Sequence, residues 1–177
     1  MVKRIMFLLA LPLAVFGGNL SLTNGLIQAH TKVFGDASIN PSVKNIQADV
    51  SMQNNAVESL KGILSFPIID FKSSERDRDE HMQEMFAMKT YPNITLQINK
   101  VRAKNKHYVI EGVLNMHGIE KPIDINSSIV QNGDSVAINA NFSVNVSDYG
   151  MEPPSLLFFT VRDRVDINAS ITLKTED

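Results

Sequence analysis

The side chains most able to do chemistry stand in two short stretches of the sequence. Arg78, Asp79 and His81 lie close together, and His117 stands directly before Gly118. A histidine near a carboxylate can act as a general acid or base, and an arginine beside them can hold a polar group of a ligand. Acidic residues and an arginine at a helix start also commonly have a structural role, because they cap the helix and anchor it to its neighbours. A histidine before glycine can likewise have a structural role in a turn. Both interpretations stay open at this point.

The sequence lacks the patterns of the common catalytic and metal sites. It has no cysteine, which excludes disulfides, thiolate zinc sites, iron–sulfur clusters and cysteine nucleophiles. The histidines show no H-x-H or H-E-x-x-H spacing, and the acidic stretch 70–79 lacks the pattern of a calcium loop. There is no G-x-S-x-G elbow, no P-loop and no G-x-G-x-x-G. We therefore predict a protein that is not an enzyme and holds no metal or resident cofactor.

Composition and charge narrow the class further. The 177 residues are 44% hydrophobic, with 9 glycines and 7 prolines, which excludes a disordered or collagen-like chain. The 17 basic and 19 acidic side chains give a net charge of −2, so no electrostatic reason exists to expect a nucleic-acid partner. The length fits one domain.

The first eighteen residues predict an export signal. Lys3 and Arg4 precede an apolar run over 5–16, and Gly17 and Gly18 follow as small residues where a signal peptidase could cut. The run is shorter than the ~20 residues that span a membrane, so we expect no stable membrane insertion, with an uncleaved anchor as the alternative. We predict a signal peptide over 1–18, a domain over 19–177 and a location in the bacterial periplasm, which suits a cysteine-free exported chain.

Alternation of apolar and polar residues dominates the rest of the chain. It runs through 136–146 and 161–173, where only Asp163 breaks the apolar row. Such alternation predicts antiparallel strands with one buried face and one solvent face. Asn132-Gly133 predicts a tight hairpin between two of them. The expected strands cover roughly 19–34 (with a break at Asn24-Gly25 left open), 44–53, 57–71, 93–104, 107–117, 120–131, 135–147 and 157–175.

One segment, Ser74–Lys89, predicts a helix. Met82, Met85 and Phe86 give it a single apolar stripe, and it opens with a Ser-x-x-Asp pattern that resembles a capping box. Eight long antiparallel strands favour closure into a barrel, whose mouth this helix would close. The interior of an eight-stranded barrel is filled by side chains or holds one ligand. With 9 Phe, 3 Tyr and no Trp, the chain lacks the aromatic girdles of an outer-membrane barrel.

Several short motifs stand in order between about residues 57 and 173. They are Arg78-Asp79-Glu80-His81-Met82, Tyr91-Pro92, GVLNMHGIEKP over 112–122, Asp148-Tyr149-Gly150-Met151 and VRDRVDI over 161–167. Together they resemble the YceI-like family of lipid- or polyisoprenoid-binding proteins, whereas 27–41 is shorter than the usual family opening. The resemblance implies an all-β, eight-stranded antiparallel, lipocalin-like barrel around an apolar cavity for an isoprenoid chain. It also implies export to the periplasm, with no established catalysis.

The inward-facing apolar residues are the candidate ligand-binding residues. The alternative is that the same residues fill a dry core. The flexible thioethers of the helix suit an irregular tail. The candidates are Leu64, Phe66, Ile68, Met82, Met85, Phe86, Leu96, Ile98, Ile110, Leu114, Met116, Ile138, Phe142 and Val144. The candidates for a head group, as partners of a phosphate or quinone oxygen, are Arg78, His81, His117, Lys121 and Arg162.

These patterns predict a periplasmic binding or carrier protein for an isoprenoid or other long-chain amphiphile, such as a quinone or polyprenyl lipid. One alternative is a filled barrel that acts through its surface as a stress-related interaction protein. Another is a hydrolase or isomerase of such lipids that uses His81 and His117. The head group, the tail length and the formation of a homodimer stay open.

Overall fold

A computed structural model of the chain describes residues 17–32, 38–153, 155–156, 159–160 and 162–176. The expected signal peptide over 1–18 lies outside these residues except for Gly17 and Gly18, which open the first strand and pair with Gln53 and Met52. Within the described ranges, no helix has the length and apolar character needed to cross a membrane.

Most of the described chain is in β-strands. The strands are β1 (Gly17–Lys32), β2 (Ser38–Ile39), β3 (Ser42–Val43), β4 (Gln47–Gln53), β5 (Lys61–Pro67), β6 (Asn93–Lys104), β7 (His107–Met116), β8 (Ile119–Asn132), β9 (Ser135–Asn145), β10 (Ser155–Leu156), β11 (Phe159–Thr160) and β12 (Arg164–Thr175). The helical elements are α1 (Arg76–Met85) and the 3₁₀ turns η1 (Val57–Ser59), η2 (Ile68–Asp70) and η3 (Val146–Tyr149).

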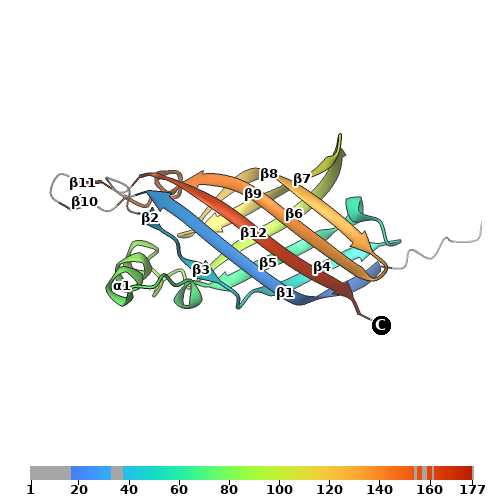
Figure 1. Ribbon diagram of the computed structural model, residues 1–177, viewed down its shortest axis with the longest axis horizontal. Helices are drawn as coiled ribbons and strands as arrows, with labels where there is room; N and C mark the ends of the chain where they lie inside the picture. Colours follow the sequence, from blue (N-terminus) through green and yellow to red (C-terminus); the bar gives the residue numbers. More distant parts are fainter. Residues whose placement is uncertain (1–16, 33–37, 154, 157–158, 161, 177) are drawn as a thin grey trace, which may run out of the picture.

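Eight long strands form a closed antiparallel barrel, which confirms the predicted fold (Figure 1). The sheet runs in the order β12-β9-β8-β7-β6-β5-β4-β1, and β12 pairs with β1 to close it. A bulge between Leu22 and Asn24 shifts the register of β1, close to the break that the sequence left open. The short strands β10 and β11 pair with each other, and they lie at the same end of the barrel as α1 (Figure 1).

Tight turns join neighbouring strands where the sequence supplies the required residues. His117 and Gly118 both have positive φ, 55° and 74°, so they form a two-residue turn of type I′ between β7 and β8. The turn between β8 and β9 consists of Gly133 and Asp134, because Asn132 still pairs with Ser135. The sequence thus predicted the hairpin correctly, but its two turn residues lie one position later than Asn132-Gly133.

Two expected strands are shorter than predicted. The stretch 57–71 contains β5 between the turns η1 and η2, and the last barrel strand starts at Arg164 instead of residue 157. Ser59 closes the first turn, because its hydroxyl accepts from the Gln53 N–H at 2.7 Å and lies 2.6 Å from the Ala56 carbonyl. Asp163, which breaks the alternation, accepts from the Ser147 N–H at 2.8 Å and so precedes the strand instead of extending it.

The helix begins at Arg76, without the predicted capping box. Its N-cap is Glu75, which makes no side-chain capping hydrogen bond. The carboxylate of Asp79 instead accepts from the Ser73 N–H at 2.7 Å, and Asp79 is 9% exposed. Asp79 therefore ties the helix to the segment that leads into it, which agrees with the structural interpretation of the acids at this helix start.

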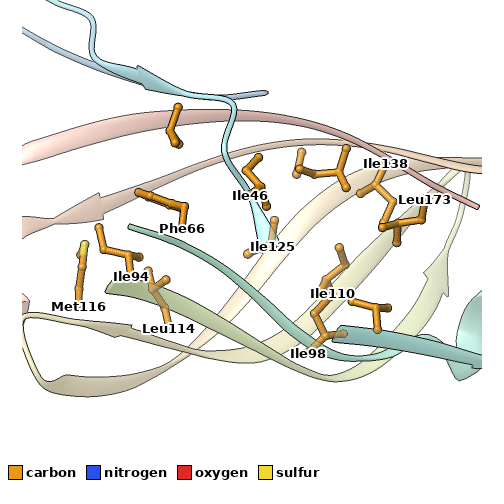
Figure 2. Close-up of a cluster of buried hydrophobic side chains, with 14 of the residues drawn as sticks. Ile46, Phe66, Ile94, Ile98, Ile110, Leu114, Met116, Ile125, Ile138 and Leu173 are labelled. Atoms are coloured by element: carbon orange, nitrogen blue, oxygen red, sulfur yellow. The ribbon is translucent and has the colours of Figure 1, made fainter. Parts of the chain in front are cut away.

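The core fills the end of the barrel that is remote from α1. Leu60, Val136 and Leu173 are 0% exposed there, and Ile98 and Val101 are 1% exposed. Figure 2 shows part of this packing, with Ile98, Ile110, Ile138 and Leu173 gathered on one side of the view. The other end of the barrel, beneath α1, is packed differently.

Candidate ligand-binding cavity

A large apolar cavity occupies the end of the barrel beneath α1. Its volume is about 1050 Å³, at the upper end of the ~300–1,000 Å³ of small-molecule sites. The carboxyl-terminal parts of β1, β5, β7 and β9 and the amino-terminal parts of β6 and β12 form its wall. These strand ends meet because the strands are antiparallel and neighbours in the barrel. The helix and its flanking segments contribute the remaining lining residues.

The structure places ten of the fourteen predicted ligand-binding residues along this cavity. Alternation along the strands directs their side chains inward, and the apolar stripe of α1 faces them. Phe66 stands next to Phe71, with ring centroids 5.6 Å apart, on the wall nearest the helix. The ten residues are Leu64, Phe66, Met82, Met85, Phe86, Leu96, Leu114, Met116, Phe142 and Val144.

The other four predicted residues lie outside the cavity lining. Ile98, Ile110 and Ile138 point inward as expected, but they belong to the filled end of the barrel and are 1–4% exposed. Ile68 is 0% exposed in η2, where its N–H donates to the Pro92 carbonyl at 2.9 Å. Alternation identifies the face of a strand that points inward, but it does not identify the level of the barrel at which the packing opens.

Polar side chains gather at the helix end of the cavity. Of the five predicted head-group residues, Arg78, His81 and Arg162 line this mouth. Carboxylates stand beside them, because Glu75, Asp77 and Glu84 also line it. The mouth therefore carries positively charged hydrogen-bond donors and negatively charged acceptors, whereas the interior of the cavity is apolar. This arrangement suits an amphiphile with a polar head and an apolar tail.

His117 and Lys121 lie away from the cavity. The His117 Nδ1 is 3.0 Å from the Tyr149 carbonyl oxygen, and its ring meets Tyr91 edge-on with centroids 5.4 Å apart. Lys121 pairs with Asp148 at 3.6 Å, beside a separate polar recess of about 300 Å³. His117 thus has a structural role in the turn between β7 and β8, and it does not share a site with His81.

One ionisable group near this end, the phenol of Tyr149, has a shifted pKa. Burial raises the pKa of Tyr149, and the charge of Asp148 adds to the shift. No cluster of three or more histidine or acidic side chains in the described part of the chain has the arrangement of a metal site.

More than half of the residues that line the cavity are not among the predicted site residues. Ile27 and Ala29 of β1 and Ile167 and Ala169 of β12 line the cavity from the seam that closes the barrel. The alternation over 161–173 identified the β12 residues as inward-facing, so only their level in the barrel was unknown. Figure 2 also shows Ile94 beside Leu114 and Met116, on the side of the view that is away from the filled end.

A closed, eight-stranded antiparallel barrel with an apolar hollow at one end is the architecture of a lipocalin-like binding protein. The family model of the YceI-like domain matches residues 24–173. The chain therefore belongs to the YceI-like family, as its motifs indicated.

Solved structures with the same fold include proteins from three bacteria. BcnA of Burkholderia cenocepacia has a TM-score of 0.73 and 17% identity, and the match covers 84% of this chain and 95% of that chain. A polyisoprenoid binding domain from Saccharophagus degradans has a TM-score of 0.65 and 10% identity, with 90% and 99% covered. A YCEI protein of Campylobacter jejuni has a TM-score of 0.62 and 20% identity, with 76% and 83% covered.

Two curated relatives are UPF0312 proteins. The one from Photorhabdus laumondii is 25% identical over 81 residues, which are 46% of this chain and 42% of the relative. The one from Yersinia enterocolitica is 20% identical over 105 residues, which are 56% of this chain and 55% of the relative. The chain thus spans about half the length of the curated relatives it matches.

Proposed function

We propose that this protein binds an amphiphilic isoprenoid lipid, a quinone or a polyprenyl species, with the tail in the barrel cavity and the head at the mouth. The observation that carries the proposal is the apolar cavity of about 1050 Å³, whose charged lining residues come from the helix and from Arg162. The described fold similarity to a polyisoprenoid binding domain supports the same ligand class.

Burial of the tail supplies most of the binding free energy in this proposal. Each buried methylene contributes ~0.8 kcal/mol, and whole ligands of this size realise ~0.3 kcal/mol per heavy atom. A five-carbon isoprene unit therefore contributes about 1.5 kcal/mol after the costs of association. Four units give about 6 kcal/mol, and a few hydrogen bonds at the head bring the affinity to the micromolar range.

The mouth residues determine which head group is accepted. Arg78 and Arg162 donate N–H bonds to a carbonyl or phosphate oxygen, and charge-assisted bonds of this kind are stronger than neutral ones. His81 donates or accepts according to its tautomer. The carboxylates of Asp77 and Glu84 accept from a hydroxyl, and they oppose a highly charged diphosphate by repulsion.

The N-terminal sequence supports a role outside the cytoplasm. Its basic start, apolar run and small residues have the order of a signal peptide, so we place the binding event in the periplasm. A carrier in this compartment holds an insoluble tail out of water between two membranes. The protein acts by binding and release, without turnover of the lipid.

The test is the lipid content of protein exported to the periplasm and purified without detergent. Extraction with organic solvent followed by mass spectrometry should recover an isoprenoid lipid at about one molecule per barrel. Protein stripped of lipid should then take up one labelled quinone from phosphatidylcholine vesicles. Absence of lipid from the purified protein, together with no uptake from vesicles, would overturn the proposal.

A further inference from the structure

Exposed apolar side chains gather at the end of the barrel that carries the cavity mouth. In the described part of the chain, five large apolar side chains are 37–48% exposed, namely Ile63, Ile69, Tyr91, Ile119 and Val130. Ile69 lies in η2 after the end of β5, Tyr91 precedes β6, and Ile119 opens β8. Because β5, β6, β7 and β8 are neighbours in the barrel, these three residues lie on one stretch of its edge at the helix end (Figure 1). We call them the apolar rim.

Contacts between the connecting segments place the three rim residues one after another. The Ile68 N–H donates to the Pro92 carbonyl at 2.9 Å, which joins η2 to the segment that contains Tyr91. The Tyr91 ring lies against Gly118, where an added Cβ would clash with it. Ile119 is the next residue along the chain. Single exposed apolar side chains are ordinary on a protein surface, whereas several that adjoin one another indicate contact with another apolar surface.

The apolar rim continues the wall of the cavity. Phe71, Ile94 and Met116 line the cavity, and each lies two or three positions along the chain from a rim residue. Met116 also pairs directly with Ile119 across the turn between β7 and β8. A surface that touches the rim is therefore close to the end of the cavity at which a ligand enters.

The small size of the rim favours a lipid bilayer over a protein as its partner. A stable protein interface takes about 20–30 residues from each side, far more than three exposed side chains. A reversible contact with a bilayer needs less, because a few apolar side chains inserted among the headgroups suffice. Tyrosine is enriched at this depth, since its ring is apolar and its hydroxyl stays in water.

The proposed ligand also requires contact with a membrane for rapid exchange. Each methylene favours an apolar phase over water by a factor of about four, so a five-carbon isoprene unit does so by about a thousand. A tail of several units therefore escapes into water very slowly. Exchange becomes fast only when the end of the protein that carries the mouth touches the bilayer.

We propose that the apolar rim docks the mouth of the cavity onto a lipid bilayer. This proposal rests on the proposed lipid-binding function and adds the partner with which the protein exchanges its ligand. Docking inserts Ile69, Tyr91 and Ile119 among the headgroups, and the tail moves between bilayer and cavity during the contact. The contact is transient, because three side chains bury too little apolar surface for permanent anchoring.

Delivery of a bound lipid to vesicles tests the docking. Protein loaded with tritiated geranylgeraniol, a polyprenyl alcohol, is mixed with sucrose-filled vesicles of phosphatidylcholine and phosphatidylglycerol, and the label in the pelleted vesicles is counted over time. The initial rate should rise in proportion to the vesicle concentration, because transfer then requires collision. A rate that does not depend on vesicle concentration would show release into water and overturn the docking. Failure of the protein to take up the alcohol would overturn the lipid-binding function instead.

Matched pairs of substitutions locate the contact on the barrel. Ile69→Ser combined with Ile119→Ser should slow delivery about tenfold, because two apolar side chains no longer leave water on contact. Ile63→Ser combined with Val130→Ser is the control, since these side chains are 41% and 48% exposed but lie on β5 and β8 away from the rim. The control should deliver at the wild-type rate, and both double variants should retain the alcohol as the wild type does. Equal rates in the two double variants would overturn the assignment of the rim.

A fluorescence measurement tests docking without a bound lipid and without the double variants. The chain has no cysteine, so Ile69→Cys carries a single environment-sensitive fluorophore. Its emission should shift to the blue when vesicles are added, whereas the emission of the same fluorophore on Val130→Cys should not change. No shift at position 69, or an equal shift at both positions, would overturn the docking whether or not the cavity binds lipid. Sedimentation without vesicles tests for a second copy: a dimer that the rim double variant dissociates would assign the rim to self-association and also overturn the docking.

Discussion

Phe142 and its neighbour Asn141 provide a sharp test of which side of β9 faces the cavity. Phe142 lines the cavity and is half-buried, whereas Asn141 is exposed on the outer face. Phe142→Asp and Asn141→Asp introduce the same carboxylate at adjacent positions. The alternation of a strand is the only reason for the two changes to differ, since both positions pair with β12, at Ile167 and Asn168.

The expected loss for Phe142→Asp follows from two contributions. Full burial of a phenylalanine contributes ~1.5–3 kcal/mol, so a half-buried ring contributes about 1 kcal/mol. A fully buried carboxyl has its pKa raised by ~3–5 units; the cavity opens at one end, so we take about 2 units, which correspond to about 2.7 kcal/mol. The variant should therefore lose about 4 kcal/mol of unfolding free energy at neutral pH. Asn141→Asp should stay within ~0.5 kcal/mol of the wild type.

Urea unfolding at several pH values measures both contributions. The pKa of the introduced carboxyl is higher in the folded state than in the unfolded chain, so its penalty is complete above the folded pKa. The penalty disappears as the pH falls below the unfolded value of ~3.9, because the group is then neutral in both states. Phe142→Asp should thus regain most of the electrostatic part near pH 4. Equal losses in the two variants, or a loss that does not depend on pH, would refute the inward assignment of Phe142.

Two further predictions concern residues outside the cavity. Arg102 on β6 donates a hydrogen bond to Glu111 on β7, which lowers the pKa of the Glu111 carboxyl. The stability from this pair is therefore present above the pKa that Glu111 has in the unfolded chain. It is lost as the pH falls through the pKa that Glu111 has in the folded protein. Glu111→Gln should consequently be less stable than the wild type at pH 7 in urea, with a difference that shrinks towards about pH 3; a constant difference would contradict the pairing. Gly118→Ala forces a side chain into a left-handed backbone with φ of 74° and against the ring of Tyr91, so we expect a loss of ~1–3 kcal/mol in thermal unfolding. Gly133→Ala, with a similar φ of 61° and no atom within 4 Å, should lose less, and an equal loss would show that contact with the ring is unimportant.

The sequence was sufficient to predict the barrel but not the limits of its hollow. Inward and outward faces follow from a period of two, so Phe142 and Leu114 were assigned to the interior from the pattern alone. The same pattern includes Ile98 and Ile138, which lie in the filled end. The difference between the two sets depends on how many side chains meet at each level of the barrel, and no local pattern along a strand carries that information.

The helix start shows a different kind of limit. Ser74 and Asp77 have the spacing of a capping box, but the carboxylate that binds a backbone N–H near the helix start is that of Asp79, and the N–H belongs to Ser73. Several acidic side chains lie close together here, and each could accept a hydrogen bond from a backbone N–H near the helix start. Their spacing along the sequence alone therefore does not identify which one does. Contact with the rest of the fold selects the one that is buried.

The filled half and the hollow half of the barrel depend on each other. Empty space in a core destabilises by ~24 cal/mol per Å³, so 1050 Å³ of dry void would cost about 25 kcal/mol, more than the ~5–15 kcal/mol that stabilises a whole domain. The hollow can therefore exist only if water or a ligand fills it, which its open mouth allows. Water in an apolar cavity makes few hydrogen bonds, so a lipid tail that replaces it gains the free energy of burial. The filled end supplies the packing that keeps the walls apart, and the same packing limits how far the tail can reach.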